Sequence, residues 1–174
     1  MIRIHKGKHK TKDELGGTNE NKLKSSRSVY FISSAAGAVY FSIVFIVAFI
    51  LGVARVTIFV PRFGENVAVL LETPVVLSVS WFAALWSSEN FQVPSALVPR
   101  LIMGLVAGVT LLVAEDTLAV CLFDKTTSEF LQELLSTETH QIIGHTGQLA
   151  YALIPMAQGY MHREAYDPKR SLNE

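Results

Sequence analysis

Three charged residues lie inside stretches that otherwise have the composition of membrane-spanning helices: Arg55, Glu72 and Glu115. A charged side chain at the bilayer centre costs about 2.5–3.5 kcal/mol on insertion scales, so such residues are paired, hydrated or used in function. One guanidinium facing two carboxylates leaves an excess of acid. The residue types therefore predict either a salt bridge that locks helices together or a site that takes up a proton or cation.

The depths of these residues indicate that they meet. Counting 1.5 Å of rise per residue places Glu72 roughly 6 Å to the outer side of the bilayer midplane. Arg55 and Glu115 reach the same half from two other apolar stretches, and His145 and Gln148 reach it from the last one. We therefore predict one intramembrane polar cluster formed by these five residues.

The excess of acid in this cluster has three possible resolutions: His145 is protonated, a carboxyl group is protonated, or a cation is bound. Carboxylate and imidazole groups are also ligands for zinc or manganese. However, Glu72, Glu115 and His145 lack the close spacing of a metal-binding motif. We predict no bound metal and no cofactor.

The composition indicates a membrane protein. Half of the 174 residues are apolar and 17% are charged, against about a quarter in soluble domains. Eight of the fifteen Lys and Arg residues precede Ser28, and three more lie in the last dozen residues. Basic ends around an apolar middle predict that both termini are cytoplasmic, in a plasma or inner membrane. Acidic residues interrupt the basic start and no aromatic residues accompany it, so nucleic-acid binding is not expected.

The charge and hydropathy patterns divide the chain into three parts. Residues 1–28 are predicted to be a disordered basic cytoplasmic tail, because they contain almost no apolar side chain. Residues 29–161 form a polytopic transmembrane domain, and residues 162–174 a cytoplasmic C-terminal tail. The single cysteine, Cys121, excludes an intramolecular disulfide.

Four apolar stretches in the middle part are each long enough to cross a bilayer. They lie within residues 29–60, 66–86, 97–123 and 141–161. The fourth stretch contains the most polar residues, so it either crosses or dips in and returns; crossing places the basic C-terminal tail inside. No internal repeat of the inverted-transporter type is found.

Two connections carry recognisable signals. Pro61 and Gly64 predict a tight turn after the first stretch, in which Arg62 and Glu65 would pair. Thr126 followed by Glu129 is a capping-box pattern and predicts a helix start. The apolar stripe that follows it indicates a short amphipathic helix near residues 128–136 that lies at the membrane interface.

Small residues mark two candidate packing faces. Gly104 and Gly108 form a GxxxG pattern on the helical face that also carries Glu115, which favours an inward position for this acid. Ser33 and Gly37 make a similar pair on the first stretch. Close approach of another helix is expected at both places.

These observations predict an all-α membrane protein, a bundle of about four transmembrane helices plus the interfacial helix. The expected role is that of a non-enzymatic structural or accessory component in the lipid bilayer, acting through helix packing with itself or within a larger membrane complex. The alternative is an oligomeric proton- or cation-coupled small permease that uses the polar cluster. Catalysis is not favoured, because the chain has no GxSxG motif, no phosphate loop and no cysteine beside a base.

Overall fold

The computed structural model describes residues 12–123 and 126–165, and these residues form helices and short turns without any strand. In chain order the elements are α1 (Lys12–Ala54), the π-helical turn η1 (Arg55–Phe59), α2 (Val60–Phe63), α3 (Glu65–Asn90), α4 (Leu97–Phe123), α5 (Thr127–Leu134) and α6 (Thr139–Ala165). The prediction of an all-helical fold is confirmed for this part of the chain.

Three helical segments are long and apolar enough to cross a membrane: Ser26–Phe63, Glu65–Asn90 and Leu97–Cys121. Their mean hydropathies are 2.7, 1.8 and 2.1. The fourth long helix, α6, has 27 residues but is interrupted by polar side chains and does not reach this standard. The sequence-based expectation of a chain with several membrane-spanning helices is supported for three of them.

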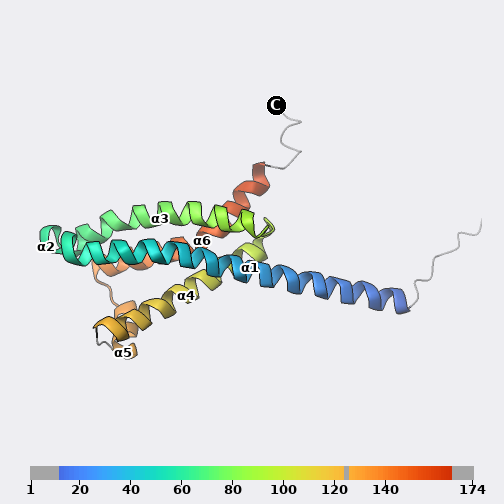
Figure 1. Ribbon diagram of the computed structural model, residues 1–174, viewed down its shortest axis with the longest axis horizontal. Coiled ribbons are helices and arrows are strands. Elements are labelled where there is room, and N and C mark those ends of the chain that lie inside the picture. The colour runs from blue at the N-terminus through green and yellow to red at the C-terminus, as the bar shows by residue number, and fades with distance from the viewer. Residues whose placement is uncertain (1–11, 124–125, 166–174) are drawn as a thin grey trace, which may run out of the picture.

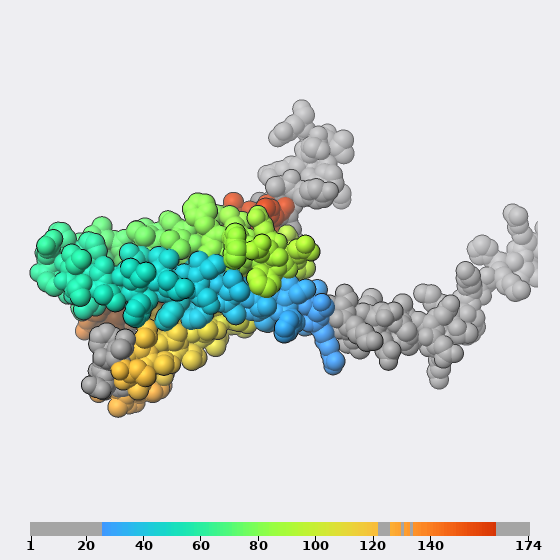
Figure 2. Space-filling view, in the orientation of Figure 1, coloured from blue at the N-terminus to red at the C-terminus, as the bar shows by residue number. Residues whose placement is uncertain are grey.

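Each of the four long helices contacts two of the others, so that they close a bundle in the order α1, α3, α6, α4, seen from the side in Figure 1. Helix α1 packs against α3 and α4, and α6 packs against the same two helices. In Figure 2, α1 (blue to cyan) lies between α3 (green) and α4 (yellow). Tyr40 of α1 reaches across the bundle, stacks on Tyr151 of α6 with ring centroids 4.6 Å apart, and donates a hydrogen bond to its carbonyl oxygen at 3.0 Å.

The connections between the helices lie at the two ends of this bundle (Figure 1). The turn between α1 and α3 and helix α5 lie at one end, whereas the turn at residues 91–96 and the C-terminal part of α6 lie at the other. The N-terminal part of α1 extends beyond the bundle at this second end. Successive long helices therefore run antiparallel, as short connections between bundle helices require.

Glycine brings α4 into backbone contact with both of its neighbours. A Cβ atom at Gly37 of α1 would collide with the carbonyl oxygen of Met103 on α4, and one at Gly104 would overlap the carbonyl oxygen of Ala152 on α6. At Gly108 a Cβ would lie 3.3 Å from the Cβ of Ala152. The predicted packing faces are thus occupied by helices of the same chain.

The first span ends differently from the prediction. The helix continues through Pro61 to Phe63, and the chain turns at Gly64 alone, with φ 78° and ψ 166°. Pro61 lies in the four-residue helix α2, directly after the π-helical turn η1. The reversal depends on Gly64, since a side chain would strain the backbone at its positive φ.

The boundaries of the tails also differ. Helix α1 begins at Lys12, within the segment 1–28 for which a disordered tail is predicted; residues 1–11 lie outside the described part. Helix propagation from the long apolar segment accounts for this, since extending an existing helix needs no new nucleus. At the other end α6 continues to Ala165, and residues 166–174 lie outside the described part.

The short helix and its capping box are confirmed. Helix α5 begins after Thr126, whose hydroxyl accepts the N–H of Glu129 at 3.3 Å. The Glu129 carboxylate in turn accepts the N–H of Thr126 at 2.8 Å. The apolar side chains of Leu131 and Leu135 are exposed, which fits an amphipathic helix.

The glycine contacts predict a large difference between two equivalent substitutions. We expect Gly104→Ala to lower the free energy of unfolding by about 1–3 kcal/mol, because α4 and α6 must move apart. Gly52→Ala should leave stability unchanged or raise it by about 0.5–1 kcal/mol, because no atom lies within 4 Å of the added methyl group. Chemical unfolding followed by circular dichroism in detergent measures both. Equal stability of the two variants would contradict the packing described.

Candidate functional site

A π-helical turn interrupts the first span at the charged residue. The N–H of Val60 donates to the carbonyl oxygen of Arg55, five residues earlier, so the turn η1 holds one residue more than an α-helical turn. Single π-turns within α-helices are frequent at functional sites. No residue pattern in the sequence predicts this turn, which rotates the residues after Arg55 relative to those before it.

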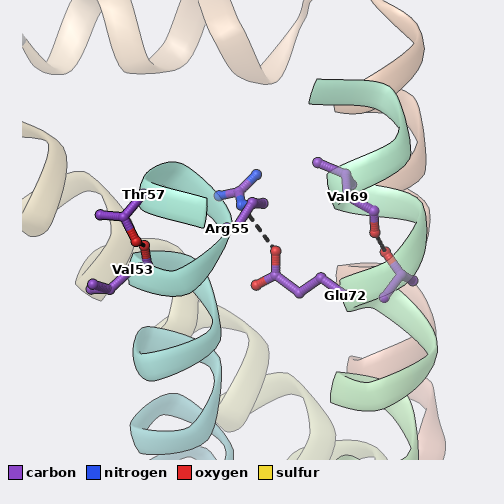
Figure 3. Close-up of polar contacts among 6 residues, drawn as sticks. Val53, Arg55, Thr57, Val69 and Glu72 are labelled. Carbon is purple, nitrogen blue, oxygen red and sulfur yellow. Dashed lines mark hydrogen bonds and ion pairs between the residues drawn. The ribbon is translucent and has the colours of Figure 1, made fainter. Parts of the chain in front are cut away.

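Arg55 forms an ion pair with Glu72 of α3 (Figure 3). The Nε atom lies 2.9 Å from Oε2, and the two side chains are 36% and 18% exposed. Nearby hydroxyl groups are satisfied on their own helices: Thr57 donates to the carbonyl of Val53 at 2.8 Å. The pair therefore joins η1, directly after α1, to α3 without competition from these side chains.

Glu115 is held in a different way. Its Oε2 accepts a hydrogen bond of 2.7 Å from Nε2 of Gln148, which joins α4 to α6. The amide is neutral, so this bond orients the carboxyl group without cancelling its charge. Arg55 lies within electrostatic range of Glu115, but its ion pair is with Glu72. The second acid thus has no ion-pair partner in the described part of the chain.

A cavity of about 260 Å³ opens between α1, α3, α4 and α6, and all five predicted cluster residues line it. These are Arg55, Glu72, Glu115, His145 and Gln148. The five side chains come from η1, α3, α4 and α6. Tyr151 also lines the cavity, and its ring is the one that stacks on Tyr40 in the core.

His145 is one of several cavity-lining residues with buried polar atoms that lack hydrogen-bond partners, as are Gln141 and Tyr151. Both ring nitrogens of His145 are buried and neither has a hydrogen-bond partner among the described residues. Most buried polar atoms are hydrogen-bonded, so an imidazole without partners beside a polar cavity is unusual. It has the donor and acceptor capacity to bind a further polar group.

The outer turn does not contain the predicted pair. Within the described residues no ion pair joins Arg62 to Glu65. Gly64 separates the two residues and redirects the chain between α2 and α3. Glu65 instead lies 3.6 Å from His140 at the start of α6, and the other nitrogen of this imidazole lies 3.6 Å from Glu138.

Sequence reasoning missed several lining residues. His140, Gln141 and Thr73 also face the cavity. His140, Gly144, Gly147 and Tyr151 follow the i, i+4, i+7, i+11 spacing of one helical face, which was a usable signal. The contribution of Thr73, one residue after Glu72, had no such signal.

The arrangement suits proton or cation chemistry better than metal binding. Among the residues that the structure describes, no group of three or more His, Cys, Asp or Glu side chains could hold a metal ion. The cavity instead combines an ion pair, a carboxyl group held by an amide and an imidazole without partners. These groups can accept a proton, donate one, or bind a small cation.

The fold and this cavity define a class: a helical bundle with three helices long and apolar enough to span a membrane and a polar cavity between its helices. No protein-family model, no curated protein and no solved structure matches the chain significantly. The assignment of a role therefore rests on the cavity.

The ion pair predicts a coupled response to neutralisation. We expect Arg55→Gln and Glu72→Gln each to destabilise the bundle, because each leaves a partly buried charge without its partner. The loss should lie between the roughly 0.2–1 kcal/mol of an exposed pair and the roughly 3–5 kcal/mol of a broken buried pair.

The double variant should be more stable than the sum of the two losses predicts. Chemical unfolding of the four proteins in detergent measures this coupling, with Arg62→Gln as the control that breaks no ion pair. Strictly additive losses would contradict an energetic role of the pair.

Proposed function

We propose that the chain is an integral membrane protein in which α1, α3, α4 and α6 all cross the bilayer, with both termini in the cytoplasm. A helix of 27 residues is roughly 40 Å long, which exceeds the hydrocarbon thickness of about 30 Å. Four of the polar residues of α6 that lower its hydropathy line the internal cavity: His140, Gln141, His145 and Gln148. Its exposed side chains include Ile142, Leu149 and Leu153, which suit contact with lipid.

In this topology α5 and the turn at Gly64 lie at the outer surface, and the turn at residues 91–96 lies inside. The outer connections then contain only two basic residues, Arg62 and Lys125. This agrees with the positive-inside rule for a plasma or inner membrane. The exposed apolar side chains of α5 would rest on the outer interface.

We infer that the protein acts as a small permease, working as an oligomer, that takes up a proton or a cation at this cavity. One observation carries the inference: Glu115 lines the cavity, is bonded to a neutral amide and has no ion-pair partner in the described part of the chain. Arg55 and Glu72 offset one another, so the acid in excess is Glu115. Ionisable residues inside membrane spans commonly mark ion and proton pathways.

A non-enzymatic structural or accessory role, exercised through helix packing with itself or with a larger membrane complex, is the second candidate. The Arg55–Glu72 ion pair favours it, because this pair fastens η1 to α3. The exposed apolar face of α1 around Phe49, Ile50 and Val53 is available to a partner helix. The small residues Gly37 and Gly104 are already used within the chain, so a partner would approach another face.

Neutralising Glu115 separates these two roles. We expect Glu115→Gln to fold, because an amide can still bond Gln148, and to reduce pH-gradient-driven uptake of protons or monovalent cations to the level of empty vesicles. Purified protein in liposomes loaded with a pH-sensitive dye measures this flux. Asp116→Asn is the matched control: this neighbouring acid does not line the cavity and accepts a bond from Thr127 at 3.4 Å. Undiminished flux in Glu115→Gln would refute the permease.

The topology can be tested with the native thiol. Cys121 is a free, exposed cysteine near the end of the third span. A membrane-impermeant maleimide should label it from outside in intact cells, and Cys121→Ser should remove the signal. Labelling only after the cytoplasmic side is opened would invert the proposed orientation.

A further inference from the structure

A second hollow lies beside the polar cavity, between α4 and α6 and below α5. It has a volume of about 390 Å³ and is lined mainly by aliphatic side chains. Its walls include Leu105, Val109 and Leu112 of α4, Leu149 and Ala152 of α6, and Leu134 of α5. We call this hollow the α4–α6 groove. In the proposed topology it runs from the outer surface under α5 towards the bilayer centre.

Small residues account for the space. Gly108 has no side chain where α4 faces α6, and Ala152 supplies only a methyl group on the other side. A larger residue at either position would fill the floor of the groove. Leu105 and Leu149 are 61% and 63% exposed at its rim, so the groove is accessible from the side that would face lipid.

The groove and the polar cavity share a wall. His145, Gln148 and Leu111 line both spaces. Of these three, His145 has two buried nitrogens without hydrogen-bond partners, and Gln148 is bonded to Glu115. A molecule whose chain lies in the groove would therefore place its polar end beside the imidazole of His145 and the amide of Gln148, on the wall behind which Glu115 lines the polar cavity.

The charged residues of the polar cavity determine which head group the bound molecule would carry. Glu115 is the acid in excess, because the charge of Arg55 is offset by Glu72 at 2.9 Å. An anionic head group would be repelled by Glu115, whereas a cationic one would neutralise it. A primary ammonium group has three N–H donors, which match the carboxylate of Glu115 and the amide oxygen of Gln148.

We propose that the α4–α6 groove binds a single-chain amphiphile with a primary ammonium head group, the chain in the groove and the head group at Glu115 and Gln148. This inference rests on the proposed function in one respect, the role of Glu115 as the cation-binding group. It extends that function by naming the cation as a long-chain ammonium compound. Such a ligand needs an apolar groove for its chain and an acid in the adjoining cavity for its head group.

The test uses three photoreactive dodecyl probes that differ only in the head group: a primary amine, an alcohol and a carboxylate, each with a diazirine in the chain. The full-length protein in lipid nanodiscs is labelled and its peptides are identified by mass spectrometry. We expect saturable labelling of α4 and α6 by the amine, displaced by unlabelled dodecylamine. Labelling by the carboxylate probe should be at least about tenfold lower than labelling by the amine probe.

Two pairs of variants locate the chain and the head group. Leu149→Trp should fill the groove and abolish saturable labelling, whereas Leu153→Trp, on the same helix but outside the groove, should not. Glu115→Gln should reduce labelling by the amine by about tenfold or more and leave the alcohol unaffected, whereas Asp116→Asn should change neither. Circular dichroism confirms that each variant is folded.

Distinct results would overturn the inference. Equal labelling by all three probes, insensitive to Leu149→Trp, would mean ordinary contact with bilayer chains. Labelling that needs the groove but not Glu115 would remove the ammonium assignment. Flux of protons or small cations that depends on Glu115, without amine binding, would overturn the ligand and leave the permease standing. Amine binding that depends on Glu115, without such flux, would support the ligand and refute the transport of small ions.

Discussion

Close contact between the backbones of α4 and its two neighbours is the constraint on which the rest of the structure depends. Glycine at positions 37 and 104 lets α1 and α6 approach α4 to distances that any side chain would prevent. Such contacts maximise van der Waals packing, which drives helix association where no hydrophobic effect operates between apolar helices. They also fix the rotation of each helix. The rotation of each helix in turn determines which side chains lie close to Glu115.

The polar cluster shows how a low-dielectric interior sorts similar residues into different roles. Glu72 and Glu115 are the same residue type and line the same cavity, yet one is paired with a guanidinium and the other with an amide. Arg55 can form a close ion pair with one carboxylate while remaining within electrostatic range of the second. The bundle therefore offsets the charge of Glu72 internally and leaves Glu115 without an ion-pair partner in the described part of the chain.

The sequence predicted the composition of this site better than its internal pairing. Depth depends only on the rise per residue, so counting along four stretches predicted that Arg55, Glu72, Glu115, His145 and Gln148 meet, and all five line the cavity. Pairing depends on the rotation of each helix, about 100° per residue, and the π-turn at Arg55 changes that rotation. The predicted ion pair between Arg62 and Glu65 is absent from the described residues. The backbone conformation of Gly64 redirects the chain between them, and Glu65 lies near His140 instead.

The different bonds of the two acids bear on whether the cluster is structural. Replacing Glu72 by an amide would leave Arg55 without its counter-ion, so the charge of Glu72 contributes to packing. Replacing Glu115 by an amide would keep a hydrogen bond to Gln148 and remove a charge that costs about 2.5–3.5 kcal/mol at the centre of a bilayer. An ionisable group at position 115 thus provides nothing to the bundle that glutamine could not provide. What it adds is the ability to exchange a proton or bind a cation, and that ability is where we place the function.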